Sequence, residues 1–408
     1  MCPDGQNSPV DWDRTKEHPP CHNQGITMSI GRCCRFPKGK VRGYALLMAL
    51  GCIVATPVSR LAVAQHQGVR TYLCFRTTSP VVVDGTIDDA VWRSIPWTEE
   101  FIDIEGISRP VPRFRTRVKI AWDSTFLYVA AELEEPHVWA TITKRDSVIF
   151  RDNDFEVFID PDGDNHQYYE FEINALNTGW DLRLIKPYRD GGPPVDSWNI
   201  AGLVTAVAVQ GTLNDPHDAD TGWSVEIAFP WKALGEFAQR PVPPRNGDQW
   251  RINFSRVEWR HEITQGRYRR AAGTKEDNWV WSPQGFVDMH RPERWGIVQF
   301  AHDRFATITP DRSMPCRWAL MEVYYAQKSF FERHRAWAGD LQTLGFPPAV
   351  GLCRPSITLI PDGYIASCEF HDESGTRRRV HLREDSCLRV DEGDGCQPGS
   401  HPTNRREP

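Results

Sequence analysis

The sequence predicts a mainly β protein: an antiparallel β-sandwich with jelly-roll or immunoglobulin-like layers, followed by a small α+β module. Two observations support this prediction. Segments with strand-like patterns recur between residues 81 and 300 and are separated by Gly, Pro, Asp and Asn, as is typical of short strands joined by turns. After residue 300, apolar residues at helical spacing precede three further strand-like segments.

The clearest alternation lies between residues 150 and 177. Apolar residues alternate with mostly acidic ones in the strands expected at Asp154–Ile159 and Tyr168–Ala175. A period of two indicates half-buried strands, and the link between them is rich in turn-forming residues. We therefore expect a hairpin whose carboxylates face outward beside exposed rings, a surface better suited to sugars or a cation than to nucleic acid.

Similar patterns predict the other elements of the sandwich. Its remaining strands are expected at Val81–Asp84, Arg115–Trp122, Phe126–Leu133, Asp181–Pro187, Leu203–Gln210, Gly222–Phe229, Gln249–Glu258 and Trp295–Phe300. Single helical turns are expected at Asp88–Ser94 and Pro230–Leu234, and long loops at 136–153, 188–199 and 259–294. The C-terminal module is expected to contain a helix over Trp318–Ala338 and strands at Ser356–Ile360, Tyr364–Glu369 and Arg378–Glu384.

The first 64 residues are expected to be a secretory signal peptide with a doubtful N-terminal extension. Basic residues at 38–42 precede an apolar run from Tyr44 to Val58, and Ala62-Val63-Ala64 fits a small-x-small cleavage site. Cleavage near Ala64 predicts a secreted, periplasmic or cell-surface protein with no membrane span. A lipoprotein anchored through Cys52 is the alternative. The mature chain is expected to contain a sandwich at 72–301, the small module at 302–392 and a disordered tail at 393–408.

Charge and cysteine content narrow the function further. The net charge of −6 argues against nucleic acid as the main partner. Between residues 75 and 315 there is no cysteine, whereas five follow near the C-terminus: Cys316, Cys353, Cys368, Cys387 and Cys396. In an exported chain such a cluster predicts disulfides, whose connectivity the sequence leaves open.

Six segments resemble, in register, the family 9 carbohydrate-binding modules, the xylan- and cellulose-binding class. They are VVVDGTIDDAVW (Val81–Trp92), IAWDSTFLYVAAELEEP (Ile120–Pro136), FRDNDFEVFIDPDGD (Phe150–Asp164), GWSVEIAFPWKAL (Gly222–Leu234), GDQWRINFSRVE (Gly247–Glu258) and WSPQGFVDMHRPERWGIVQF (Trp281–Phe300). The resemblance covers roughly residues 72–301. It implies a β-sandwich that binds polysaccharide or oligosaccharide, accompanies polysaccharide-degrading enzymes such as glycoside hydrolases, and often holds calcium.

The resemblance also implies a set of sugar-binding residues. Two tryptophans clamp a sugar ring in this family; the first matches Phe150, and the second falls at Met289, for which Trp279, Trp281 or His290 could substitute. Glu156 matches the family's carboxylate, and Glu172 and Asn174 fall at its polar contacts. Because sugars need flat apolar faces and fixed polar groups, the expected site comprises Phe150, Glu156, Glu172, Asn174, Trp279, Trp281 and Arg291.

Asp160, Asp162 and Asp164 form a D-x-D-x-D pattern with a glycine inside it. Calcium prefers several carboxylate and carbonyl oxygens on one turn, so these residues are candidate calcium ligands. The final Glu of an EF-hand loop would fall at Phe171, which excludes that motif. An ordinary acidic turn is the alternative.

Two other function classes remain open. Related sandwich domains bind haem for electron transfer, and Met289 with His290 could supply axial ligands. A glycosidase needs two carboxyl groups across a cleft, but the many acids here do not identify such a pair. The sequence shows no nucleophile elbow, HExxH or P-loop. We therefore expect recognition of carbohydrate without catalysis.

Overall fold

The computed structural model describes residues 68–346 and 353–391, all within one compact unit. The expected signal peptide, the Cys52 anchor, Cys396 and the expected tail at 393–408 lie outside the described residues. Among the helices that the structure describes, none is long and apolar enough to cross a membrane.

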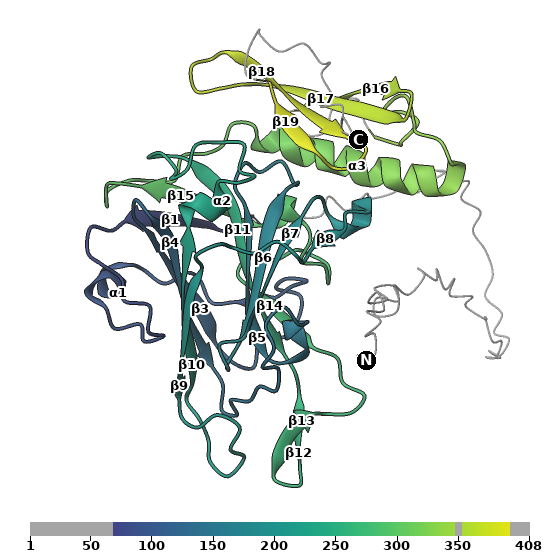
Figure 1. Cartoon of the computed structure of the whole chain (residues 1–408). Coiled ribbons are helices and arrows are strands. Elements are labelled where there is room, and N and C mark those ends of the chain that lie inside the picture. The colour runs from purple at the N-terminus through teal and green to yellow at the C-terminus, as the bar shows by residue number, and fades with distance from the viewer. Residues whose placement is uncertain (1–67, 347–352, 392–408) are drawn as a thin grey trace, which may run out of the picture. The chain divides into compact units, whose positions relative to one another are not determined.

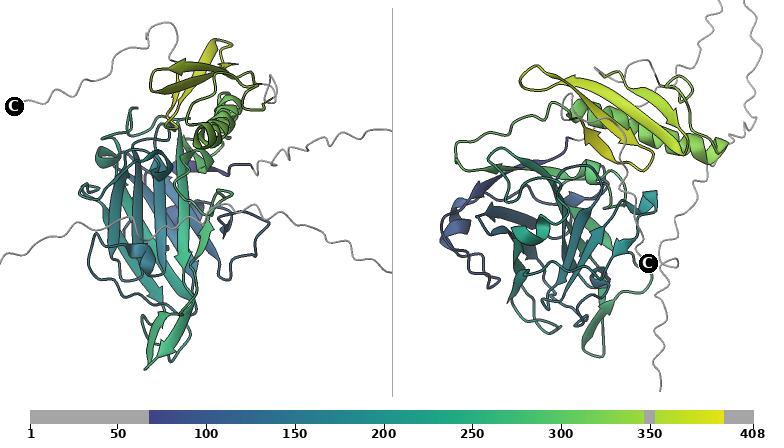
Figure 2. Two further views of the ribbon diagram at one scale, coloured as in Figure 1. Left: turned by 90° about the vertical axis from the view of Figure 1, so that its right-hand side faces the viewer. Right: turned by 45° about the horizontal axis from the view of Figure 1, so that its top comes forward.

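Thirteen of the described strands form one sheet that curls over a shared core (Figures 1 and 2). The strand order is β8 (Pro194–Val195), β7 (Gly179–Leu184), β6 (Tyr168–Asn174), β5 (Asp154–Asp160), β11 (Gln249–Glu258), β15 (Gly296–Ala301), β1 (Thr71–Arg76), β3 (Thr116–Trp122), β4 (Phe126–Glu134), β10 (Gly222–Pro230) and β9 (Val204–Gln210). In addition, β14 (Asp277–Val280) pairs with β11 and with β2 (Ile102–Asp103).

Side chains from distant strands of this order meet in the core. Phe171 on β6 packs edge-on against Phe229 on β10, with ring centroids 6.0 Å apart. The sheet is thus folded over itself, and the apolar halves of its alternating strands are buried between two layers. This arrangement confirms the expected mainly β fold of sandwich type.

Some elements differ from the expected ones. Val81–Asp84 is not a strand, because side chains bind its backbone: Val82 N–H donates to Asp89 and Asp84 N–H to Glu226. The first described strand is β1, which pairs in parallel with both β15 and β3. The expected loop at 259–294 contains β14 and the hairpin of β12 (His261–Thr264) and β13 (Arg267–Arg270).

Short helical elements lie between the strands of the sandwich. The two expected helical turns are present as α1 (Ala90–Ser94) and α2 (Trp231–Leu234). Within residues 68–346 and 353–391 there are also three 3-10 turns, which the sequence patterns did not indicate: η2 (Ile149–Arg151), η3 (Tyr188–Asp190) and η4 (Pro292–Arg294). The last three lie in the loops around the acidic hairpin.

The C-terminal module consists of α3 (Met314–His334) packed on a four-stranded sheet. The sheet order is β16 (Ser356–Ile360), β17 (Gly363–His371), β18 (Arg377–Arg383) and β19 (Leu388–Val390) (Figure 1). Leu320, Val323 and Tyr364 belong to its separate apolar core. The five described cysteines are all unpaired, so the expected disulfides do not occur among the residues that the structure describes.

The turn between β5 and β6 joins the sandwich to this module. Arg317 Nη1 donates to Gly163 O over 2.8 Å, and Leu388 N–H donates to Asp164 O over 3.0 Å. Asn165 Nδ2 donates to Ser386 O over 3.0 Å. The acidic hairpin expected from the sequence is therefore a docking point within the protein and is not an open turn.

Candidate functional site

The alternation in the acidic hairpin separates two faces of one sheet layer. The odd-numbered residues of β5, such as Phe155, point into the core between the layers. On the opposite face, Glu156 lies between Ser255 of β11 and Glu172 of β6, and Glu172 lies beside Trp180 of β7. The next row places Phe158 beside Glu170. We call the face that carries these three glutamates the outer face.

The outer face is covered, which corrects the expectation of outward-facing carboxylates in solvent. Only 5% of Glu156 and 2% of Glu172 is exposed. The loop before β5 lies over them, because Phe150 N–H donates to Glu172 Oε2 over 3.0 Å. Asp152 fixes the same loop by accepting the N–H groups of Thr141 and Ile142.

Burial of several acids together makes this face electrostatically unusual. Carboxylate oxygens of Asp154, Glu156 and Glu172 lie within 4.8 Å of one another. The pKa of Glu172 is raised well above its usual value, first by burial and then by Glu156 and Asp154. Burial, and then Glu156, likewise raises the pKa of Asp154. These groups therefore favour protons, hydroxyl donors or a cation as partners.

Two polar atoms of the outer face have no hydrogen-bond partner within the described part of the chain. They are Asp154 Oδ2 and Ser255 Oγ, both buried. The other Asp154 oxygen accepts Val257 N–H over 3.2 Å. Because buried polar groups in proteins are almost always paired, these two atoms indicate a place where a guest with hydroxyl groups could bind.

Tyr188 on η3 lies at the exposed rim of the acidic cluster, and no sequence pattern indicated a role for it. Its side chain is 36% exposed, and its ring lies edge-on to that of His290, with centroids 4.3 Å apart. Burial of the hydroxyl raises the pKa of Tyr188, and Glu170 and Glu172 raise it further. The phenol therefore lies near both glutamates. Glu170 could have been found from the same alternation as Glu172.

Trp279 and Trp281 occupy the core, so the expectation that they stack on a sugar is wrong. Trp281 is fully buried, packs edge-on against Tyr72 at 6.4 Å and donates its indole N–H to Glu99. Trp279, also buried, lies edge-on to Phe114. Both rings lie on the core side because β14 is a strand of the sandwich and not the loop expected there.

The other residues expected to contact the sugar differ in how far they are exposed. Asn174 is buried, and its amide holds loops: Nδ2 donates to Ile142 O and Asp152, and Oδ1 accepts Thr178 N–H. Phe150 is half-buried and packs against the apolar cluster that contains Met289. Arg291 is half-buried, lies over the Phe286 ring at 4.0 Å and contacts Asp288.

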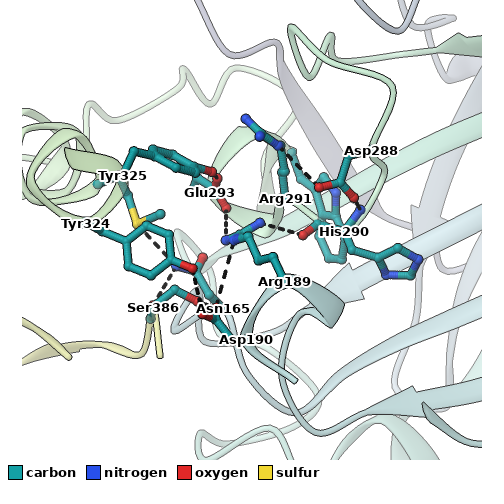
Figure 3. A network of polar contacts seen from close by, with 12 residues as sticks. Asn165, Arg189, Asp190, Asp288, His290, Arg291, Glu293, Tyr324, Tyr325 and Ser386 are labelled. Carbon is teal, nitrogen blue, oxygen red and sulfur yellow. Dashed lines mark hydrogen bonds and ion pairs between the residues drawn. The ribbon is translucent and has the colours of Figure 1, made fainter. Parts of the chain in front are cut away.

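A polar network holds the Tyr188 turn against the C-terminal module (Figure 3). Arg189 donates to His290 O over 2.7 Å and pairs with Glu293 at 3.0 Å. Asp190 accepts the hydroxyls of Tyr324 and Ser386, each over 2.6 Å. The module therefore positions the turn that carries the exposed ring.

The Asp160, Asp162 and Asp164 side chains converge as a calcium site requires, with oxygens within 4.8 Å of one another. Burial and the neighbouring aspartates raise the pKa of Asp162 to about 9 and that of Asp164 to about 6. Asp160 accepts the N–H groups of Gly163 and Asn165. Three clustered carboxylates suit a hard cation, so the residues fit calcium.

Met289 and His290, the haem-ligand alternative, both have structural partners. Met289 is buried in the apolar cluster that includes Phe158 and Trp180 of the outer face. His290 Nδ1 lies 3.0 Å from the Tyr168 hydroxyl. These contacts do not favour haem ligation by either residue.

Residues 83–279 match the family model described as carbohydrate family 9 binding domain-like. Among solved structures, a family 9 module from Caldicellulosiruptor kristjanssonii in complex with cellotriose is 16% identical, with a TM-score of 0.39, and the match covers 59% of this chain and 99% of the module. The same module in complex with glucose matches with the same identity and TM-score. A putative carbohydrate-binding protein from Bacteroides uniformis is 18% identical, with a TM-score of 0.43, 57% of this chain and all of that one being covered. The comparison with curated proteins found no match.

Proposed function

We propose that this protein recognises the hydroxyl groups of a polysaccharide or oligosaccharide on the outer face of β5, β6 and β7, which the loop carrying Phe150 uncovers when the ligand binds. The observation that carries the proposal is the set of clustered glutamates beside an exposed ring: Glu156, Glu170 and Glu172 lie in two adjacent rows, and Tyr188 lies at their rim. The match of residues 83–279 to the carbohydrate family 9 model supports the same class of ligand.

The chemistry of the site matches a sugar ring. Carboxylate oxygens accept hydrogen bonds from sugar hydroxyls, and Asp154 Oδ2 and Ser255 Oγ are buried atoms that such a ligand would satisfy. The ring of Tyr188, with Phe150 as the second apolar surface, would contact the C–H face of the sugar. Glu156 and Glu172 keep their expected roles in this proposal, while Asn174 holds the surrounding loops.

Binding to soluble xylan, β-glucan and cello-oligosaccharides, measured by affinity electrophoresis and calorimetry on the mature chain, tests the proposal. Tyr188→Ala and Glu156→Gln are expected to weaken binding by at least about tenfold, because each removes a central contact. The matched controls are Phe305→Ala, whose ring is 91% exposed, and Glu262→Gln on β12. Unchanged binding in both site variants, or no binding by the parent protein, would refute the site.

We further propose that the protein is exported and acts beside glycoside hydrolases. A chain exported through the N-terminal segment would meet plant or algal polysaccharides outside the cell, and would act there beside glycoside hydrolases without catalysing cleavage itself. Secretion of a tagged full-length chain, with cleavage near Ala64 read by N-terminal sequencing, tests the export step. Retention of the intact chain in the cytoplasm would contradict it.

We also propose that calcium binds at Asp160, Asp162 and Asp164 as a structural ion. It would neutralise three clustered carboxylates in the turn that docks the C-terminal module. Added calcium is expected to raise the melting temperature of the parent protein and to have little effect on Asp162→Asn. Equal shifts in the two proteins would show that any calcium binds elsewhere.

A further inference from the structure

Three cysteines of the C-terminal module converge although they are far apart in sequence. Cys316 lies in the first turn of α3, Cys353 lies before β16, and Cys368 lies in the middle of β17. Their sulfur atoms all lie within 4.8 Å of one another, and all three side chains are buried. None of them is paired with another cysteine.

The arrangement suits a metal ion better than a disulfide. A disulfide joins two sulfurs and would leave the third thiol of this group without a role. Zinc bound to thiolates at about 2.3 Å holds the sulfurs of a tetrahedral site roughly 3.8 Å apart, a spacing compatible with the limit observed here. Cysteine thiolates are also the preferred ligands of soft and borderline cations.

The position of the three cysteines explains what a bound ion would stabilise. They belong to the apolar core that α3 shares with β17 and β18, and each comes from a different part of the module. Small domains with few buried residues often depend on a metal for stability. An ion here would join the start of the helix, the segment entering the sheet and the central strand.

We propose that Cys316, Cys353 and Cys368 together bind one thiophilic cation of the zinc type through three thiolates. Each thiol would lose its proton to solvent on binding. This site is separate from the outer face and does not depend on sugar recognition.

Metal content and cobalt spectroscopy on the full mature chain, purified in the presence of zinc, test the proposal. We expect about one zinc per chain by mass spectrometry, and a thiolate-to-cobalt charge-transfer band in the near ultraviolet after exchange with cobalt. Cys316→Ser and Cys368→Ser are expected to lose both signals. Cys387→Ser is the matched control, because Cys387 is a buried, unpaired cysteine of the same module that lies outside the cluster.

A measurement on the parent protein keeps the proposal testable if the serine variants fail to fold. In the zinc-bound protein, a thiol reagent should leave these three cysteines unmodified. Adding a chelator, with no reductant present, should make all three reactive. If peptide mapping of the non-reduced parent protein finds two of the three cysteines in a disulfide, the proposal is wrong. It is equally wrong if the reduced protein binds neither zinc nor cobalt.

Discussion

The two faces of the layer formed by β5, β6 and β7 have the same alternating sequence but different chemistry. On the inner face, Phe155 and Phe171 pack into the core shared with the opposite layer. On the outer face, Glu156 and Glu172 lie side by side and are also buried, beneath the loop that carries Phe150. A period of two in the sequence therefore identifies the side of the sheet to which a residue points, whereas the covering loops decide whether that side meets solvent.

Truncation on the inner face should have the largest effect on stability. Phe254→Ala removes a fully buried ring that is stacked on Phe155 at 6.0 Å. We expect a loss of about 3–5 kcal/mol in the free energy of unfolding, because the cavity would not be refilled. Urea denaturation measures it, and Phe305→Ala, an exposed ring, should change stability by less than about 0.5 kcal/mol. Equal losses in the two variants would contradict the assignment of the inner face.

Loosening the rim of the outer face should have a smaller effect on stability but a measurable one on binding. Asp190→Ala leaves the hydroxyls of Tyr324 and Ser386 without their acceptor. We expect a loss of about 1–3 kcal/mol in stability and weaker binding of the oligosaccharide, because the turn with Tyr188 is no longer fixed. Asp190→Asn, which keeps an acceptor oxygen, should recover part of both. Sugar affinity that is unchanged in Asp190→Ala would show that the module does not position the turn.

The smallest expected effect is a change in pH dependence on the outer face. In the folded protein, burial raises the pKa of Glu172, and the charges of Glu156, Asp154 and Glu170 raise it further. The hydrogen bond from Phe150 N–H partly offsets this rise. The contribution of Glu172 to stability is therefore complete below the pKa of the unfolded chain and is lost as the pH rises toward the higher folded value.

Glu172→Gln removes the ionisable group, and with it the loss of stability at higher pH, while keeping an acceptor for the Phe150 N–H group. We expect the stability of the parent protein to fall relative to Glu172→Gln as the pH rises from about 4.5 to about 8, measured by chemical denaturation at several pH values. Glu262→Gln, an exposed control on β12, should leave the difference unchanged. A parent protein that gains stability relative to Glu172→Gln over this range would contradict the raised pKa.

Much of the fold could be predicted from local patterns. β5, β6, β10 and β11 follow the expected segments closely, because each carries a strong alternation or a continuous buried run. The strand predicted at Val81–Asp84 does not form, because acidic side chains from other segments accept its backbone N–H groups. The position of Trp281 in the core depends on β14, which no local pattern indicated.

The candidate site was harder to predict than the fold. Glu156 and Glu172 could be found because they repeat on one face of a hairpin. Tyr188 could not, since its place beside them depends on contacts of Arg189 and Asp190 with residues more than a hundred positions away. The cysteine cluster likewise joins three distant parts of the chain.

The decisive experiment is a crystal structure of residues 65–408 with a bound oligosaccharide. We expect a sugar ring against Tyr188, with hydroxyl groups within hydrogen-bonding distance of at least one of Glu156, Glu170 and Glu172. A sugar bound at another surface, with the loop of Phe150 still closed over the three glutamates, would contradict this expectation.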